Sequence, residues 1–505
     1  MSNSLDEPHL SKIRITLWPI QNSELKKFLP MGMMMFLVLF DYTLLRNTKD
    51  ALLITAPMCG AEVIPFLKIG DIPCAILFFF IYAKLSNILS REKLFYSCLI
   101  PFLIFFGVFA FIIYPNREFL HPTLESVITL REAYPHLKWF ISIYGVWSFG
   151  IFYILSELFG VIIIALLFWQ FANEVTRTNE AKRFYPFFGF LGNIALMTAG
   201  TFGEYLAQLN ASLPSEADAW GMSISYIITS VVAAGTGVIC IYWWMNRYVL
   251  IDPFYYDGAK PEEKKKDKPK LSIGESLSYL LSSKYLGFIA ILVVSYGITA
   301  NIIDVTWKSQ VKDYFPKSND YFAFMGRFSY WTGIATMALI MTTKGIVRRF
   351  GWFTGAIITP SMFLITSALF FTFILFKDSL ESPTLMFGVG SLYMAVMIGA
   401  TQNILSKGMK YSLFDPTKEM AYIPLDQELK VKGKAAVDVI GSRLGKSGGG
   451  FIQFILLTLT AGTQMTILPY LCAILIVVML TWMGAVKGLS KLYTDKLDSS
   501  KKLQT

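Results

Sequence analysis

Long apolar segments alternate with short polar segments along almost the whole chain, and this pattern predicts a bundle of membrane-spanning helices. The segment 94–114 contains no charged residue, and neither does the segment 139–156. A hydrocarbon core about 30 Å thick needs roughly 20 apolar residues per helix. We therefore predict about twelve spans, at 28–45, 63–82, 94–114, 147–172, 184–206, 222–244, 285–305, 322–342, 352–376, 384–405, 447–464 and 467–487.

The composition supports the same fold class. Of the 505 residues, 54% are hydrophobic and only 16% are charged, whereas a soluble globular chain carries about 25% charged residues. The predicted spans leave no polar stretch long enough for a separate soluble domain. The sequence thus predicts an all-α polytopic membrane protein.

The basic residues are concentrated in alternate connections. Lys and Arg are frequent in the N-terminal tail and in the even-numbered connections, while the segment 208–223 has no basic residue but contains Glu216 and Asp218. Cytoplasmic loops of membrane proteins carry the excess of Lys and Arg. The pattern therefore predicts both termini in the cytoplasm. It also explains the net charge of +10 without nucleic-acid binding, which we do not expect.

The sixth connection divides the chain into two halves. The predicted regions are a cytoplasmic tail at 1–27, a six-helix half at 28–244, a basic cytoplasmic linker at 245–284, a second six-helix half at 285–487 and a cytoplasmic tail at 488–505. The lysine-rich segment 261–269 within the linker is expected to be solvated; binding to anionic membrane lipid is the alternative.

A weak internal repeat supports this division. The second span is followed by Lys84-Leu-Ser-Asn-Ile-Leu-Ser-Arg91, and the eighth by Lys344-Gly-Ile-Val-Arg-Arg-Phe-Gly351. Both are short basic turns at matching positions, and they resemble the degenerate loop signature of the major facilitator superfamily. That resemblance implies a major-facilitator-like 6+6 bundle with a binding site between the halves, near the membrane midplane.

Four ionisable residues fall inside the predicted spans or at their edge. They are Lys68, Glu157, Asp304 and Lys446. Such a residue costs at least about 2.5 kcal/mol at the centre of a spanning helix, so it is by default a candidate for function. We expect these residues to bind substrate or to act as a gate, with fixed structural ion pairs as the alternative. Burial raises the pKa of a carboxyl group, so a carboxylate can also exchange a proton.

Two further cations, Arg46 and Lys49, follow the first span. They are three residues apart, so a helix places them on one face, and they lie where the distribution of basic loops does not predict cations. Arg binds phosphate bidentately and Lys binds it as a point charge. We therefore predict contact with a phosphate-bearing ligand, with interfacial snorkelling of both side chains as the alternative.

One segment resembles a nucleotide-binding motif but does not match it fully. Gly445-Lys446-Ser447 resembles the end of a Walker A motif, but the first glycine of that motif would have to stand where the chain has Ile440. An ATP-hydrolysing pump is therefore not expected. The glycines are better explained by tight helix packing or an unwound turn.

No arrangement typical of an enzyme is present. The three histidines lie outside the predicted spans, and there is no Ser/His/Asp or Cys/His arrangement. The five cysteines form no metal-binding spacing and are expected to be small core residues. We therefore predict a protein that is not an enzyme, with no cofactor, no metal and no obligate protein partner.

The N-terminal segment indicates a location. The first 27 residues lack the basic region and apolar run of a secretory signal, and they also lack the composition of an organelle transit peptide. The chain begins with Met1. We therefore expect a multi-pass protein of a bacterial inner membrane.

Several sequence blocks are characteristic of one family. They include Leu45-Arg-Asn-Thr-Lys-Asp50, Phe168-Trp-Gln-Phe-Ala-Asn173, Glu180-Ala-Lys-Arg-Phe-Tyr185, Val305-Thr-Trp-Lys-Ser309 and Gly445-Lys-Ser-Gly-Gly449. Taken together, these blocks closely resemble the nucleotide transporters, or ATP:ADP translocases, of obligate intracellular bacteria and plastids, and the resemblance extends from about residue 13 to 492.

The resemblance implies exchange of external host ATP for internal ADP by alternating access. It also implies that four charged positions are essential for transport, and by motif these are again Lys68, Glu157, Asp304 and Lys446. Relatives usually have Glu at the position of Asp304, and the run after Lys68 is shorter here, with an additional acid at Asp71. These departures leave an alternative open, namely uptake or exchange of GTP, UTP, CTP or NAD, with or without protons.

Overall fold

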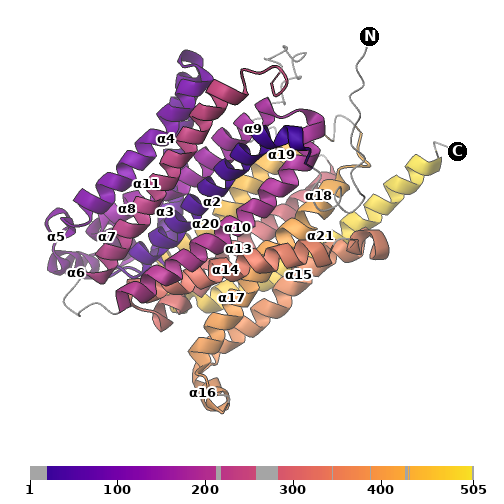
Figure 1. Ribbon diagram of the computed structural model, residues 1–505. Helices are drawn as coiled ribbons and strands as arrows, with labels where there is room; N and C mark the ends of the chain where they lie inside the picture. Colours follow the sequence, from indigo (N-terminus) through magenta and orange to yellow (C-terminus); the bar gives the residue numbers. More distant parts are fainter. Residues whose placement is uncertain are drawn as a thin grey trace, which may run out of the picture.

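The computed structural model describes residues 20–211, 218–256, 283–343, 345–386, 388–426, 430 and 433–502. The regular elements of the described chain are all helices (Figure 1), which confirms the all-α prediction. We call the helices up to residue 249 the N-terminal half and those from residue 284 onward the C-terminal half.

The N-terminal half consists of long helices and a group of short ones. The long elements are α2 (Leu25–Ile54), α3 (Val63–Ile88), α4 (Arg91–Val108) with the π-helix η2 (Phe109–Ile113), α8 (Trp147–Phe159) with η4 (Gly160–Phe168) and α9 (Trp169–Val175), α10 (Thr178–Ala211), and α11 (Ala219–Trp244) with η5 (Met245–Val249). The short elements are η1 (Asn22–Glu24), α5 (Arg117–Leu120), α6 (Leu124–Ala133), η3 (Pro135–Leu137) and α7 (Lys138–Gly145).

The C-terminal half is built in a similar way. Its long elements are α13 (Lys284–Tyr314), α14 (Ser318–Thr342), α15 (Ile346–Leu375), α17 (Ser391–Met409) with η6 (Lys410–Phe414), α20 (Lys446–Thr460) and α21 (Gln464–Lys502). Its short elements are α16 (Lys377–Leu385), α18 (Asp415–Ala421), α19 (Lys434–Ile440) and η8 (Gly441–Gly445).

Each of the twelve predicted spans coincides with a long described helix. Eight of the described helices are long and apolar enough to cross a membrane. The other four are α10, α14, α17 and α20, which are shorter or more polar. Of these, α14 packs against α2, α10 and α17. Because a helix covered by other helices meets little lipid, its surface does not have to be apolar.

Two predicted spans end well before their helices do, and the first span is one of them. It was predicted to end at residue 45, but α2 continues to Ile54, so the run 46–50 lies within the helix. At the other end of the chain, α21 continues to Lys502, past the predicted span end at 487. Most of the predicted linker, 257–282, lies outside the described residues.

The two halves approach each other closely at α10 and α14. A Cβ atom added to Gly200 of α10 would lie 2.4 Å from the carbonyl oxygen of Gly326 in α14, so a larger residue cannot occupy position 200 without moving a helix. Small residues allow such close packing of helices in membranes. Further contacts between the halves join α2 to α14 and α3 to α20.

Hydrogen bonds join the halves at one end of the bundle. We call this the closed end; it is formed by the connections 55–62, 115–146, 315–317 and 461–463, and Figure 1 shows α5, α6 and α7 gathered there. The hydroxyl groups of Thr55 and Ser318 are 2.7 Å apart, the backbone amide of Gln464 donates to Glu62 at 2.9 Å, and Trp139 Nε1 donates to the carbonyl of Gly462 at 3.1 Å.

At the opposite end, the described ion pairs stay within one half. Lys27 pairs with Glu180 at 2.7 Å within the N-terminal half, and Lys434 pairs with Glu419 at 2.5 Å within the C-terminal half. Within the part of the chain that the structure describes, the polar contacts between the halves lie in the middle of the bundle and at the closed end.

Candidate functional site

The candidate site begins with the charged run on α2. Lys49 and Asp50 are each only 1% exposed, because α2 packs against α8, α10, α11 and α14. A buried charge is tolerated only when it is paired or hydrogen-bonded. The partners of these two residues therefore define the site.

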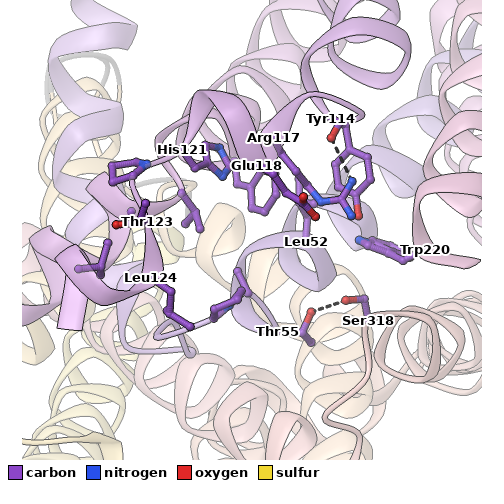
Figure 2. Close-up of a pocket in the computed structure, with 17 residues that line it drawn as sticks. Leu52, Thr55, Tyr114, Arg117, Glu118, His121, Thr123, Leu124, Trp220 and Ser318 are labelled. Atoms are coloured by element: carbon purple, nitrogen blue, oxygen red, sulfur yellow. Dashed lines mark hydrogen bonds between the residues drawn. The ribbon is translucent and has the colours of Figure 1, made fainter. Parts of the chain in front are cut away.

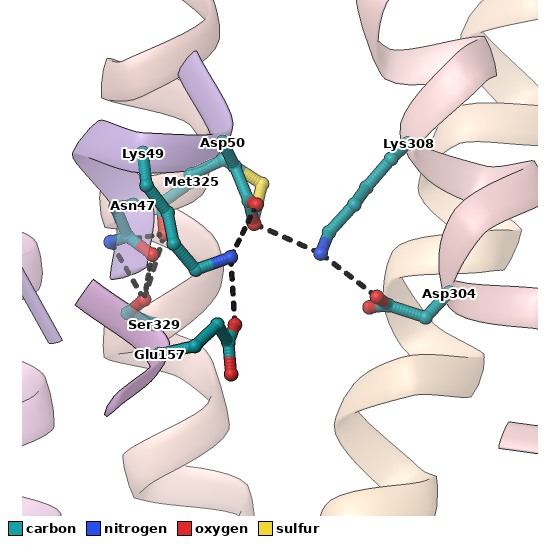
Figure 3. Close-up of polar contacts among 8 residues, drawn as sticks. All are labelled: Asn47, Lys49, Asp50, Glu157, Asp304, Lys308, Met325 and Ser329. Atoms are coloured by element: carbon teal, nitrogen blue, oxygen red, sulfur yellow. Dashed lines mark hydrogen bonds and ion pairs between the residues drawn. The ribbon is translucent and has the colours of Figure 1, made fainter. Parts of the chain in front are cut away.

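A chain of ion pairs connects three helices (Figure 3). Lys49 Nζ lies 2.8 Å from Asp50 Oδ1 and 2.9 Å from Glu157 Oε1 of α8. Lys308 Nζ of α13 lies 2.9 Å from Asp50 Oδ2 and 2.8 Å from Asp304 Oδ2, one helical turn away on its own helix. We call Glu157, Lys49, Asp50, Lys308 and Asp304 the ion-pair chain.

The side chains at the centre of the ion-pair chain are buried, and those at its two ends are more exposed. The Asp50 side chain is 1% exposed, whereas the side chains of Glu157 and Asp304 are 33% and 26% exposed. A soluble ligand can thus reach the terminal carboxylates while the central pair stays out of water, where electrostatic attraction is stronger.

The pair between Asp50 and Lys308 joins the two halves. Asp50 belongs to the N-terminal half and Lys308 to the C-terminal half. Beside it, the side-chain amide of Asn47 on α2 donates to Ser329 Oγ on α14 at 3.1 Å. Separation of the halves would break these contacts, so the ion-pair chain responds directly to their relative position.

The sequence analysis named three members of this chain, Glu157, Asp304 and Lys49, as candidate site residues. Glu157 pairs with Lys49 and Asp304 with Lys308, not with Lys68. The Lys68 side chain lies beside α20, since a Cβ atom added to Gly450 would be 3.6 Å from Lys68 Cδ. Lys68 forms no ion pair with another described residue. Lys446 begins α20, but its side chain lies outside the described part of the structure.

The two candidate cations on α2 differ in their burial and in their partners. Interfacial snorkelling, the alternative for both, is wrong for Lys49, which is buried and holds two carboxylates. Lys49 is therefore saturated by acidic partners in this conformation. Arg46 is half-buried, and its Nη2 atom is buried without a hydrogen-bond acceptor among the described residues.

Sequence reasoning assigned no role to Asp50, Lys308 or Lys407. For two of them the sequence did contain an indication, namely their spacing from another charged residue. Lys308 follows Asp304 by four residues, a spacing that places both on one helix face, and Asp50 is adjacent to Lys49. Lys407 carried no such signal, because its neighbours come from other helices. Its ammonium lies 4.4 Å from the centroid of the Phe328 ring.

The glycine-rich segment before α20 serves packing, as expected. Gly445 ends the π-helical turn η8, and a Cβ atom added to Gly297 of α13 would lie 2.4 Å from the backbone of Gly445. The two backbones therefore meet without side chains between them. This close approach sets the position of Lys446 at the start of α20.

A cavity of about 400 Å³ lies near the closed end (Figure 2). Its polar lining includes Arg117, Glu118 and His121. Arg117 pairs with Asp218 at 2.8 Å, and burial together with the nearby Arg117 lowers the pKa of His121. His121 is consequently neutral at pH 7, and Glu118 adds a negative charge. The cavity thus offers no surplus of positive charge for a polyphosphate.

The described residues contain no group of three or more His, Cys, Asp or Glu side chains placed to hold a metal ion. The three carboxylates of the ion-pair chain are paired with two lysines instead. The chemistry that the site supports is therefore reversible ion pairing.

Comparison with known families gives a match over nearly the whole chain. Residues 3–493 match the family described as TLC ATP/ADP transporter. The chain is 48% identical over 496 residues to the ADP,ATP carrier protein 1 of Chlamydia muridarum, covering 98% of this chain and 93% of that protein. It is 44% identical to the ADP,ATP carrier protein 1 of Rickettsia bellii, covering 99% and 100%. A plastidic ATP/ADP-transporter of Solanum tuberosum is 46% identical, covering 93% and 74%.

Solved structures support the fold. A bacterial homologue of the iron transporter ferroportin, in an inward-facing state, superimposes with a TM-score of 0.58 at 13% identity, covering 94% of this chain and 99% of that one. The nucleoside transporter NupG gives a TM-score of 0.50 at 12% identity, covering 93% and 99%. These likenesses show that the chain shares the helical-bundle fold of these two transporters.

Proposed function

Because the chain belongs to the family of TLC ATP/ADP transporters, we propose that it exchanges external ATP for internal ADP by alternating access. It is a multi-pass membrane carrier and not an enzyme. The substrates in this proposal are nucleotides, and membrane lipid surrounds the bundle.

The proposal includes an orientation. The basic connections place both termini in the cytoplasm of a bacterium, with the chain in the inner membrane. In that orientation the closed end faces the exterior. The hydrogen bonds between the halves at the closed end then belong to a state in which the site is reachable from the cytoplasm.

The observation that carries the proposal is the ion pair between Asp50 and Lys308. It joins the two halves inside the bundle, next to cations that lack acidic partners. In the proposed cycle, nucleotide phosphates bind Lys68, Lys446 and Arg46. Glu157 and Asp304 act as gates, Glu157 through its pair with Lys49 and Asp304 through its pair with Lys308. A bound anion that competes for these lysines weakens the contact between the halves, which favours rocking of one half against the other.

Exchange is expected to depend on internal nucleotide. Loading proteoliposomes with ADP is expected to raise the initial rate of ATP uptake severalfold over empty vesicles, because a carrier that must return loaded cannot cycle without a counter-substrate. The measurement is uptake of labelled ATP with and without ADP inside. Uptake that is indifferent to internal ADP and collapses when a proton gradient is dissipated would support proton-coupled uptake instead. ATP hydrolysis required for uptake would refute the proposal.

The runner-up is transport of another nucleotide, with or without protons. Asp71 favours it. This acid lies one turn after Lys68 on α3, its Oδ1 atom is buried without a hydrogen-bond donor among the described residues, and Glu157 and Lys49 are among its charged neighbours. An additional carboxylate in this position lowers the positive potential offered to phosphates and supplies a site for a proton.

Asp304 provides a test of specificity. Asp304→Asn is expected to remove most of the exchange activity, because Lys308 loses one of its two carboxylates. Asp304→Glu is expected to retain exchange but to change the order of preference among nucleotides, because the longer side chain moves the carboxylate by about one bond length. The measurement is inhibition of labelled ATP uptake by a panel of nucleotides, with surface expression determined for each variant. An unchanged panel for Asp304→Glu would show that the shorter side chain does not set specificity.

A further inference from the structure

Two cations on helices that both pack against α14 have no anionic partner among the described residues. Arg46 on α2 and Lys407 on α17 are both half-buried, and neither forms an ion pair or a hydrogen bond with another described residue. Both sit within helices of a membrane bundle, where an unpaired charge is costly. Such residues are retained in this position when a ligand supplies the missing charge.

Packing contacts place the two side chains near one another. The Lys407 ammonium lies over the ring of Phe328 on α14, at 4.4 Å. The next residue, Ser329, accepts a hydrogen bond from Asn47, and Asn47 directly follows Arg46 on α2. The charged groups around Lys407 are Arg46, Asp304, Lys308 and Asp50. Like charges thus approach the place where α2 and α17 both pack against α14.

The nearby carboxylates do not neutralise this pair. Asp304 and Asp50 are already shared by Lys308, at 2.8 and 2.9 Å. The Nη2 atom of Arg46 is buried without an acceptor, and an unsatisfied buried donor costs about 1–3 kcal/mol, more when it is charged. The Phe328 ring offers Lys407 a weak cation–π contact and no hydrogen-bond acceptor.

We propose that Arg46 and Lys407 form an anion site that takes one phosphate group of the bound nucleotide, separate from the phosphate that Lys68 contacts. This site rests on the proposed function and adds Lys407 to the substrate-binding residues. The planar guanidinium of Arg46 offers two parallel donors to a phosphate, and Lys407 adds a second charge from the C-terminal half. A phosphate held between them joins α2 to α17 and thereby links the two halves through the substrate.

The test is a binding measurement on purified protein in detergent. The melting temperature is recorded against increasing ADP, ATP and inorganic tripolyphosphate, since a ligand that binds the folded state raises it, and a weaker ligand needs a higher concentration to give the same rise. We expect Lys407→Gln to weaken ADP and ATP binding about tenfold, which corresponds to about 1.4 kcal/mol. Lys407→Arg is expected to remain within about threefold of the unmodified protein, because it keeps the charge. Lys487→Gln on α21 removes the same charge from an exposed position and is expected to have no effect.

The outcomes distinguish failure of the anion site from failure of the proposed function. Unchanged ADP and ATP affinity in Lys407→Gln, with or without loss of exchange, would overturn the anion site and leave the proposed function standing. Stabilisation of the unmodified protein by tripolyphosphate but not by nucleotides, lost in Lys407→Gln, would keep the anion site and refute the proposed function. Stabilisation by none of the three would refute both.

Discussion

Replacing Lys308 with glutamine is expected to abolish nucleotide exchange. Lys308 holds Asp50 of the N-terminal half and Asp304 of the C-terminal half at 2.9 and 2.8 Å. The substitution leaves the buried carboxylate of Asp50 and the partly exposed carboxylate of Asp304 without this cation. Breaking a buried pair by removing one partner typically costs about 3–5 kcal/mol, and here the loss falls on the contact that changes when the halves move. The measurement is exchange of labelled ATP in vesicles.

Matched variants separate a specific effect from unfolding. Lys284→Gln changes an exposed lysine on the same helix and is expected to leave exchange unchanged. The double variant Lys308→Gln with Asp50→Asn removes both charges of the pair between the halves, and we expect it to be produced in the membrane at a higher level than Lys308→Gln alone. Normal exchange by well-expressed Lys308→Gln would show that the ion-pair chain is not part of the transport cycle.

A disulfide across the closed end is expected to stop exchange reversibly. Thr55 and Ser318 come from different halves, and their hydroxyl groups are 2.7 Å apart. Cysteines at both positions therefore place two thiols within reach of each other, as disulfide geometry requires. If transport needs the closed end to open, oxidation of Thr55→Cys/Ser318→Cys locks it shut. Exchange is expected to fall to background and to return after treatment with a reducing agent.

The natural cysteine nearest in sequence to this position does not interfere. Burial raises the pKa of the Cys59 thiol to about 12, so it stays protonated at neutral pH, and the thiolate is the reactive form. The two single-cysteine variants serve as controls and are expected to be insensitive to oxidation. Full exchange by the oxidised double variant, with cross-linking verified by mass spectrometry, would show that the closed end does not open during transport.

The sequence by itself determined the helices and their class. Uncharged runs such as 94–114 coincide with membrane-length helices, because backbone groups in lipid must be hydrogen-bonded within the segment. Charged residues inside the predicted spans were also visible in the sequence. The free-energy cost of placing a charge in the membrane made Glu157 and Asp304 candidate site residues before any partner was known. The motif blocks were sufficient to indicate the family, which the comparisons then confirmed.

Helix ends were less predictable where charges are paired. The first span was ended at residue 45 because the following run, 46–50, contains Arg46, Lys49 and Asp50. In the structure α2 continues through this run, since partners on other helices neutralise Lys49 and Asp50. Hydropathy counts each residue alone, so it cannot register a charge that is cancelled by a distant residue.

Only the tertiary structure decided which charges meet. The sequence singled out Lys68 and Glu157 without indicating their partners; in the structure Glu157 binds Lys49, and the two halves are joined through Asp50 and Lys308. Partner choice depends on how each helix is rotated and how far it is shifted along its neighbour, and residue spacing within one helix does not contain that information. For the same reason, the unpaired state of Arg46 and Lys407, which is the basis for an anion site, became visible only after α2, α14 and α17 had been packed together.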